Sequence, residues 1–410
     1  MNAMSVYSEE VRDFYERRPY PPPLTSLDKH RELYANPQRR RALFHLVWPT
    51  EPLRADLRIL VAGCGTSQAA KFAIREQGAQ ITAIDISETS LNHTRSLQRK
   101  HELNNLVLHQ LSILEVGKLK EKFDLIVCTG VLHHLTDPDL GLQALRDVLH
   151  PDGAMQIMVY ARYGRAGIYM MQEYCRLLAI TPSNQELLAL AQSLNSLPDD
   201  HPLVPLFRKG LDFQHPDALA DTFLHPQDRS YSVRDVFEWL ERCGMSFGRW
   251  YEQAPYLPEC GAVAATPHAL RLSALPQREQ FSACELFRGT ITRHHFIAYH
   301  NERRTERDPI RFNDEEWRRY VPISVPWAVC VRDHLPPGTA AVLVNRAHHH
   351  VDLALRLDEG QYRVFSSING TRTLGEIAET WRKEGVDGIE LFRKLWQYDQ
   401  IVFDASSAKG

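Results

Sequence analysis

The sequence predicts an α/β protein built on a doubly wound, mainly parallel sheet. Two observations lead to this prediction. An apolar strand, a glycine turn and a helix follow one another over residues 58–77. A second apolar run ends at Asp85, about twenty residues after the glycine turn. Short apolar runs then alternate with amphipathic helical segments as far as residue 160. This alternation favours right-handed crossovers, with a ligand site at the carboxyl ends of the strands.

The first strand–turn–helix unit has the features of a ligand-binding loop. The apolar run 58–62 leads into Gly63-Cys64-Gly65. Glycine lets the backbone turn tightly and approach a ligand where a Cβ atom would collide. Residues 67–77 are rich in helix formers, so the free N–H groups of a helix start are expected to face the turn.

Asp85 narrows the class of ligand. A carboxylate at the end of the second strand, residues 80–86, can accept hydrogen bonds from both hydroxyls of a ribose. The third glycine of a nicotinamide-binding fingerprint is absent, because Ser67 and Gln68 stand there, and no Gly-Lys-Ser/Thr phosphate loop follows. An adenosine ligand without a pyrophosphate remains, and S-adenosylmethionine fits that description.

The later elements continue the α/β pattern. Strands are expected at 106–109, 123–128 and 155–160, with a helix at 140–149 and a turn at Pro151-Asp152-Gly153 before the last of these strands. A helical insertion is expected at about 166–230, with helices at 168–178 and 184–194. The chain is then expected to return to the sheet through a helix at 233–243, capped by Ser232, and strands at 246–252 and 295–299.

Four segments, taken together, resemble the class I S-adenosylmethionine-dependent methyltransferases: residues 61–65, 85–87, 131–135 and 149–153. The resemblance covers roughly residues 55–165. It implies a Rossmann-like fold and an enzyme that uses S-adenosyl-L-methionine. The residues that it assigns to the cofactor are Ala62, Gly63, Gly65, Asp85, Ile86, Ser112, Ile113, Thr129 and Gly130. The chain departs from the family at two positions: many members carry an acidic residue where this chain has Ala62 and a third glycine where it has Ser67. The resemblance therefore does not assign the residues that hold the cofactor's amino group.

The candidate catalytic residues are His134 and, second, His133, which directly follow the fourth strand where the methyl group should point. The alternative is that one of the two histidines is structural. Candidate substrate contacts are Tyr15 and Tyr20 in an N-terminal lid, Tyr160, and His225, Asp228 and Tyr231 in the loop before helix 233–243. The alternative for these contacts is that the aromatic residues anchor a short helix and that the loop docks the insertion.

The chain is expected to have three parts: an arm or lid at 1–50, a cofactor-binding domain at 51–300, and a small α+β domain at 312–410 after a charged linker at 301–311. The last part resembles, weakly, the small winged-helix domains that present peptide substrates to modifying enzymes. Within it, Thr373 is expected to cap a helix, with Glu376 completing a capping box.

Composition excludes several classes of partner. The 410 residues have a net charge of −3, which argues against a nucleic-acid partner. Seven scattered cysteines without a Cys-x-x-Cys pair, and no apolar run long enough for a bilayer, predict a soluble cytoplasmic protein without a membrane partner. The runs 348–350 and 294–295 are histidines without acidic or cysteine companions at ligand spacing, so no metal is expected.

The sequence therefore predicts a methyltransferase that modifies an unidentified small-molecule acceptor. Two alternatives remain open: a peptide or protein methyltransferase that recognises its substrate through the C-terminal domain, and a non-catalytic S-adenosylmethionine-binding sensor. A dehydrogenase ranks below these, because the missing glycine disfavours nicotinamide binding.

Overall fold

The computed structural model describes residues 3–208, 215–303 and 310–407. The chain divides into two compact units. The first contains residues 1–31, 55–247 and 289–303, and the second contains residues 32–54, 248–288 and 304–410. The predicted boundaries placed 248–288 with the cofactor domain, whereas the structure groups this segment with the C-terminal part of the chain. Part of the predicted linker lies outside the described residues.

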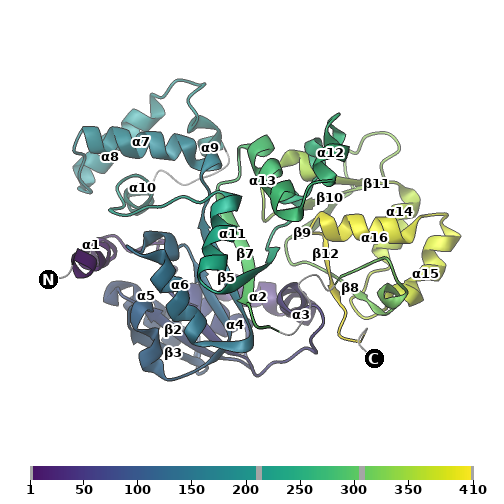
Figure 1. Ribbon diagram of the computed structural model, residues 1–410, viewed down its shortest axis with the longest axis horizontal. Coiled ribbons are helices and arrows are strands. Elements are labelled where there is room, and N and C mark those ends of the chain that lie inside the picture. Colours follow the sequence, from purple (N-terminus) through teal and green to yellow (C-terminus); the bar gives the residue numbers. More distant parts are fainter. Residues whose placement is uncertain (1–2, 209–214, 304–309, 408–410) are drawn as a thin grey trace. The chain divides into compact units, whose positions relative to one another are not determined.

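A seven-stranded sheet with the order β3-β2-β1-β4-β5-β7-β6 forms the centre of the first unit (Figure 1). Its strands are β1 (Arg58–Ala62), β2 (Gln80–Asp85), β3 (Leu106–Gln110), β4 (Phe123–Thr129), β5 (Leu149–Tyr160), β6 (Met245–Trp250) and β7 (Arg293–His300). The first five strands pair in parallel and β7 is antiparallel to β5. The predicted Rossmann-like sheet is confirmed, and strand order reverses between β1 and β4, where such sheets bind their ligands.

Three helices follow strands of this sheet: α4 (Gln68–Arg75), α5 (Glu88–Lys100) and α6 (Pro138–Asp147). Helix α6 begins two residues earlier than predicted, because the carboxylate of Asp137 accepts hydrogen bonds from two backbone N–H groups of its first turn. The helix α11 (Val233–Arg242) has the predicted Ser232 cap, which forms a capping box with Asp235.

The predicted turn at Pro151-Asp152-Gly153 is wrong. These residues lie inside β5, whose pairing with β4 shifts register between Phe123 and Leu125. Proline has no N–H to donate to a ladder, so an irregularity in pairing accommodates it within the strand. A Cβ atom at Gly153 would lie 2.8 Å from the carbonyl oxygen of Asp124, which explains the glycine at this position.

The insertion consists of α7 (Ala166–Leu177), α8 (Asn184–Asn195), α9 (Val204–Arg208) and α10 (Pro216–Phe223) (Figure 1). The apolar faces of these helices pack into one buried cluster that also contains Phe14 of α1 (Ala3–Arg17). Arg18 extends this contact through a 3.1 Å ion pair with Asp217 and a 2.6 Å hydrogen bond to Asn184. The N-terminal helix is therefore fixed to the insertion.

The second unit combines small sheets with helices. Its sheets are β11-β10-β9 and β12-β8, from β8 (Val321–Ser324), β9 (Ala328–Val331), β10 (Ala341–Asn345), β11 (Leu355–Leu357) and β12 (Ile401–Asp404). The helices are α3 (Pro37–Val47), α12 (Ala269–Ser273), α13 (Gln277–Arg288), α14 (Glu359–Ser366), α15 (Leu374–Lys383) and α16 (Gly388–Gln397); α2 (Asp28–Tyr34) spans the boundary at residue 31.

The capping box of Thr373 and Glu376 is confirmed at the start of α15. The α+β content of this part is present, and the winged-helix resemblance stays a prediction. Across the described residues, no helix combines the length and the apolar character needed to cross a bilayer.

The buried carboxylate of Asp399 contacts another segment of the second unit, residues 248–288. Its Oδ2 atom accepts a 2.8 Å hydrogen bond from the backbone N–H of Ala254, and its Oδ1 atom lies 3.3 Å from the guanidinium of Arg249. Burial raises the pKa of Asp399 to about 7; Arg249 opposes the shift and Glu252 adds to it.

Replacement of Asp399 by asparagine is expected to flatten the pH dependence of stability. Between the ordinary carboxyl pKa and pH 7, the folded protein holds a proton here that the unfolded chain releases, so stability falls as the pH rises through this window. The slope from this one group is at most about 1.4 kcal/mol per pH unit. Asparagine tolerates the left-handed backbone at this position, where φ is 52°. Urea unfolding at pH 5, 6, 7 and 8 measures the slope, with Asp333→Asn, an exposed aspartate, as the control. An unchanged slope in the Asp399 variant would contradict the prediction.

Candidate cofactor and acceptor site

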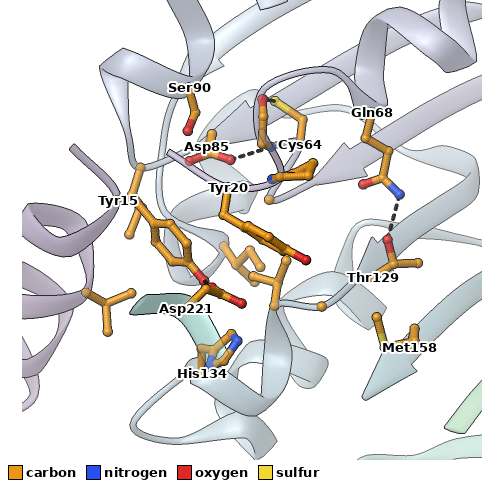
Figure 2. A pocket seen from close by; sticks show the side chains of 18 of the residues that line it. Tyr15, Tyr20, Cys64, Gln68, Asp85, Ser90, Thr129, His134, Met158 and Asp221 are labelled. Atoms are coloured by element: carbon orange, nitrogen blue, oxygen red, sulfur yellow. Dashed lines mark hydrogen bonds between the residues drawn. The ribbon is translucent and has the colours of Figure 1, made fainter. Parts of the chain in front are cut away.

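The first unit contains a cavity of about 580 Å³ at the carboxyl ends of the parallel strands (Figure 2). Residues that follow or end β1, β2, β4 and β5 all contribute to its wall, among them Gly63, Asp85, Thr129 and Tyr160. The N-terminal segment and the helical insertion complete it through Tyr15 and other residues. The cavity lies where the strand order predicts a ligand site.

The glycine loop after β1 has the geometry that a close ligand requires. Gly63 and Gly65 adopt φ values of +72° and +54°, in the left-handed region that favours glycine. The backbone N–H groups of Gly63 and Cys64 both donate to the carbonyl of Ile84, at 2.9 and 3.0 Å, which fixes the loop against β2. The hydroxyl of Thr94 donates to the carbonyl of Gly65 at 2.9 Å. The loop is therefore rigidly placed below the cavity.

Asp85 joins this loop to the end of β2. Its carboxylate accepts hydrogen bonds from the N–H groups of Gly65 and Ser87, at 2.8 and 2.9 Å. Burial raises the pKa of Asp85, whereas these N–H donors oppose the shift. Each carboxylate oxygen keeps a further lone pair, and the side chain lines the cavity (Figure 2). The arrangement can accept both hydroxyls of a ribose.

The cavity brings together eight of the nine residues that the resemblance assigned to the cofactor. These are Gly63, Gly65, Asp85, Ile86, Ser112, Ile113, Thr129 and Gly130. Ala62, the ninth, is fully buried within β1 and does not contribute to the wall. Its methyl group supplies no polar contact, so other groups must hold the charged end of a cofactor.

Two polar residues of α4 line the cavity beside the glycine loop, and sequence reasoning did not select them. Gln68 donates a 2.6 Å hydrogen bond from Nε2 to the hydroxyl of Thr129. Lys71 lies one turn further along the helix; its ammonium forms no ion pair with a carboxylate anywhere in the described part of the chain. Burial lowers the pKa of Lys71. A half-buried cation without a carboxylate partner suits an anionic ligand group.

Another part of the cavity wall is aromatic and polar. Tyr15, Tyr20, His134 and Tyr160 come from separate segments and face the same space. The hydroxyl of Tyr15 donates a 3.0 Å hydrogen bond to Oδ1 of Asp221 (Figure 2). Burial raises the pKa of the Asp221 carboxyl. Asp221 lies in α10, just before the loop that contains the predicted contacts His225, Asp228 and Tyr231, and only the fold reveals that Asp221 faces the cavity.

The two histidines after β4 occupy different positions. His134 lines the cavity, and its Nδ1 atom lies 2.6 Å from the carbonyl oxygen of Gln227. Since a carbonyl can only accept, Nδ1 carries the proton and Nε2 is left with a lone pair. His133 is fully buried outside the cavity wall, and neither of its ring nitrogens has a hydrogen-bond partner. Burial, with the neighbouring His134 and Arg165, lowers the pKa of His133. Catalytic roles for the two histidines stay a prediction.

Three predicted substrate contacts lie outside the cavity wall. The ring of His225 lies against that of His134, with centroids 3.8 Å apart. Asp228 accepts a 2.9 Å hydrogen bond from Gln172, and Tyr231 forms a backbone bridge to Ala161. His225 thus packs against one wall residue, and the backbone N–H of Tyr231 donates to the carbonyl of another, Tyr160, at 2.9 Å. Roles for the three residues in substrate binding stay a prediction.

Arg165 links this support to the cavity, and sequence reasoning missed it. Its guanidinium lies 3.5 Å from the ring centroid of Tyr160 and 3.6 Å from the carboxylate of Asp228, and the side chain lines the cavity. The residue stands just before the insertion in a segment without a recognisable motif, so no local signal identifies it.

The N-terminal segment is fixed against the glycine loop and the start of α5. The hydroxyl of Thr66 donates to the carbonyl of Pro21 at 2.7 Å. The carboxylate of Glu16 accepts hydrogen bonds from the first N–H groups of α5, those of Glu88 and Thr89, at 2.6 and 3.1 Å. An anion at a helix N-terminus is favourable. Tyr15 and Tyr20 are therefore positioned as part of a cover.

Comparisons with known proteins agree with this geometry. Residues 53–197 match the family model described as a methyltransferase domain. An uncharacterized protein of Synechococcus sp. is 34% identical over 247 residues, which cover 58% of this chain and 59% of that protein. The ubiquinone biosynthesis O-methyltransferase of Coxiella burnetii is 25% identical over 142 residues, 33% of this chain and 59% of that enzyme. The chain thus spans about three fifths of the length of these curated relatives.

Solved structures extend the likeness in fold. PKMT2 from Rickettsia typhi superposes with a TM-score of 0.62 at 16% identity, covering 92% of this chain and 75% of that one. Its structure in complex with AdoHcy superposes with a TM-score of 0.60, covering 89% and 73%. The family match and the strand order agree: residues 53–197 match a methyltransferase domain, and the sheet that contains them has the Rossmann-like methyltransferase fold.

Proposed function

We propose that the protein transfers a methyl group from S-adenosylmethionine to a small-molecule acceptor. One observation carries the proposal. A single cavity joins a cofactor half, built from the glycine loop and Asp85, to an acceptor half walled by Tyr15, His134 and Tyr160. A protein that only sensed the cofactor would not need the second half, so the cavity favours turnover over binding alone.

The chemistry is an in-line displacement. The acceptor's nucleophilic atom forms a bond to the methyl carbon while the carbon–sulfur bond breaks, which leaves S-adenosylhomocysteine. The protein supplies alignment and excludes water, and the covering N-terminal segment suits both tasks. An acceptor hydroxyl or ammonium must also lose a proton. Nε2 of His134 has a free lone pair, and His134 is proposed as the base that accepts this proton.

Product analysis with separated acceptors tests the proposal. Purified protein is incubated with S-adenosylmethionine carrying a labelled methyl group and with the low-molecular-weight or the macromolecular fraction of a bacterial extract. Label that enters the small-molecule fraction, with S-adenosylhomocysteine as co-product, is the expected result. Binding of S-adenosylhomocysteine without transfer to either fraction would favour the sensor alternative.

Methylation of an amine on a peptide is the second candidate. The buried carboxylate of Asp221 faces the cavity among the rings of Tyr15, Tyr20 and Tyr160, and carboxylate and aromatic rings both attract a cationic amine. Arg165 on the same wall opposes a cation, which ranks this candidate second. Label in the macromolecular fraction alone would reverse the order.

Lys71 is expected to bind the carboxylate of the cofactor's methionine portion. Lys71→Met should weaken binding of S-adenosylhomocysteine about 10-fold, which is the loss of one charge-assisted hydrogen bond of about 1.5 kcal/mol. Methylthioadenosine lacks the amino-acid end, so its affinity should not change. Calorimetry with both ligands measures the difference, and Lys118→Met, at an exposed lysine paired with Glu115, is the matched control. Equal losses for the two ligands would show that Lys71 does not contact the carboxylate.

A further inference from the structure

Three side chains behind the acceptor wall converge in a manner typical of a metal site. A ring nitrogen of His133, a ring nitrogen of His134 and a carboxylate oxygen of Asp228 all lie within 4.8 Å of one another. His133 is fully buried, and the side chain of Asp228 is only 4% exposed. The histidine runs at 348–350 and 294–295 predicted no metal, and this group lies elsewhere. Asp228 is far from the two histidines along the chain, and only the fold brings it to them.

Unsatisfied polar atoms are concentrated at the same place. Both ring nitrogens of His133 and the Oδ1 atom of Asp228 are buried without a hydrogen-bond partner. A buried polar atom without a partner costs about 1–3 kcal/mol, so three such atoms on two neighbouring residues require an explanation. One cation between them would satisfy a nitrogen of His133 and the free carboxylate oxygen together.

Hydrogen bonds to neighbouring residues orient two of these three groups, as they commonly orient the ligands of a metal ion. Nδ1 of His134 donates to the carbonyl of Gln227, which directs the lone pair of Nε2 away from this contact. Oδ2 of Asp228 accepts a 2.9 Å hydrogen bond from Gln172 and lies 3.6 Å from Arg165, which leaves Oδ1 free. The guanidinium of Arg165 thus lies beside Oδ2, the oxygen that would not bind the ion. Carboxylates that bind metal ions are commonly supported by such a partner.

We propose that His133, His134 and Asp228 bind a divalent first-row transition-metal ion. Two neutral imidazoles and one carboxylate suit Zn²⁺ and Fe²⁺ rather than Mg²⁺ or Ca²⁺, which prefer oxygen ligands. Bond lengths of about 2.0–2.2 Å require only a small inward movement of the three side chains. Because His134 lines the cavity, the ion fixes the acceptor wall. The ion and a proton compete for the same lone pair of His134, so the base role proposed above belongs to the metal-free protein and the metal-loaded protein does not use His134 as a base.

Metal analysis of the purified protein tests this inference, and it needs neither S-adenosylmethionine nor an acceptor. The chelator-treated protein is titrated with Co²⁺, whose visible absorption reports nitrogen and oxygen ligation, and with Zn²⁺ by calorimetry. One equivalent is expected to bind and to raise the unfolding temperature. His133→Gln and Asp228→Asn each remove a proposed ligand, so each should weaken metal binding by more than about 100-fold. Loss of a residue that only supports a ligand costs roughly 10- to 100-fold.

His349→Gln is the matched control, because a run of histidines at 348–350 is the most plausible adventitious site. Binding of S-adenosylhomocysteine by each variant shows that its cofactor half is folded. Co²⁺ binding that survives in both His133→Gln and Asp228→Asn, or that is lost in His349→Gln, would overturn the assignment. No binding by the folded parent protein would overturn it as well, and would leave the proposed methyl transfer untouched.

Discussion

Replacement of Asp85 by alanine is expected to weaken S-adenosylhomocysteine binding by about 10- to 100-fold. The carboxylate accepts from the N–H groups of Gly65 and Ser87 and faces the cavity with its remaining lone pairs. Loss of hydrogen bonds between a charged group and a ribose costs about 1.5–3 kcal/mol, which corresponds to this change in affinity. The alanine variant also frees the glycine loop, so both effects act in the same direction.

A graded series separates the ribose contact from general damage. Asp85→Asn keeps the shape and one carbonyl oxygen, so it should lose less affinity than Asp85→Ala. Asp152→Asn, at an exposed aspartate in the irregular start of β5, should bind as the parent does. Calorimetry measures all three affinities, and thermal unfolding confirms that each variant is folded. Parent-like binding by Asp85→Ala would refute the ribose assignment and, with it, the orientation of the cofactor.

Local patterns were sufficient to predict which residues at the ends of β1, β2 and β4 line one cavity. These residues stand at the end of a strand or just after it: Gly63 and Gly65 after β1, Asp85 at the end of β2, and Thr129 and Gly130 at the end of β4. In a parallel sheet the ends of these strands meet at one edge, so their order along the chain already places them together. The strands and caps that form the same local units were predicted for the same reason.

The acceptor half depends on contacts between segments that are distant in sequence. Asp221 meets Tyr15 across 206 residues, and Arg165 reaches Asp228 and Tyr160 only after the insertion has folded. Neither residue belongs to a spacing pattern. The error at 151–153 has a related cause, because a register shift between β4 and β5 accommodates a proline that would otherwise indicate a turn.

Replacement of Gly63 by alanine is expected to lower the free energy of unfolding by about 2–4 kcal/mol and to abolish measurable cofactor binding. Two costs contribute. Gly63 has φ of +72°, where an alanine pays about 1–2 kcal/mol. The new Cβ atom would also lie 2.9 Å from Cγ1 of Val131 and closer still to Cγ2, so this side chain or the loop must move.

Adding Val131→Ala to the Gly63→Ala variant distinguishes the two costs, because truncation at 131 removes the atoms that the new Cβ would overlap. The double variant should regain the steric part, about 1–2 kcal/mol, and keep the strain of the left-handed backbone. Gly117→Ala is the control, since a Cβ atom there has open space around it and should change little. Urea unfolding of the parent, Gly63→Ala, Val131→Ala and the double variant gives the coupling energy. If Gly63→Ala proved as stable as Gly117→Ala, the loop would not be held in the conformation that brings its backbone against the ligand. Full recovery in the double variant would instead show that crowding by Val131, not backbone strain, requires glycine at this position.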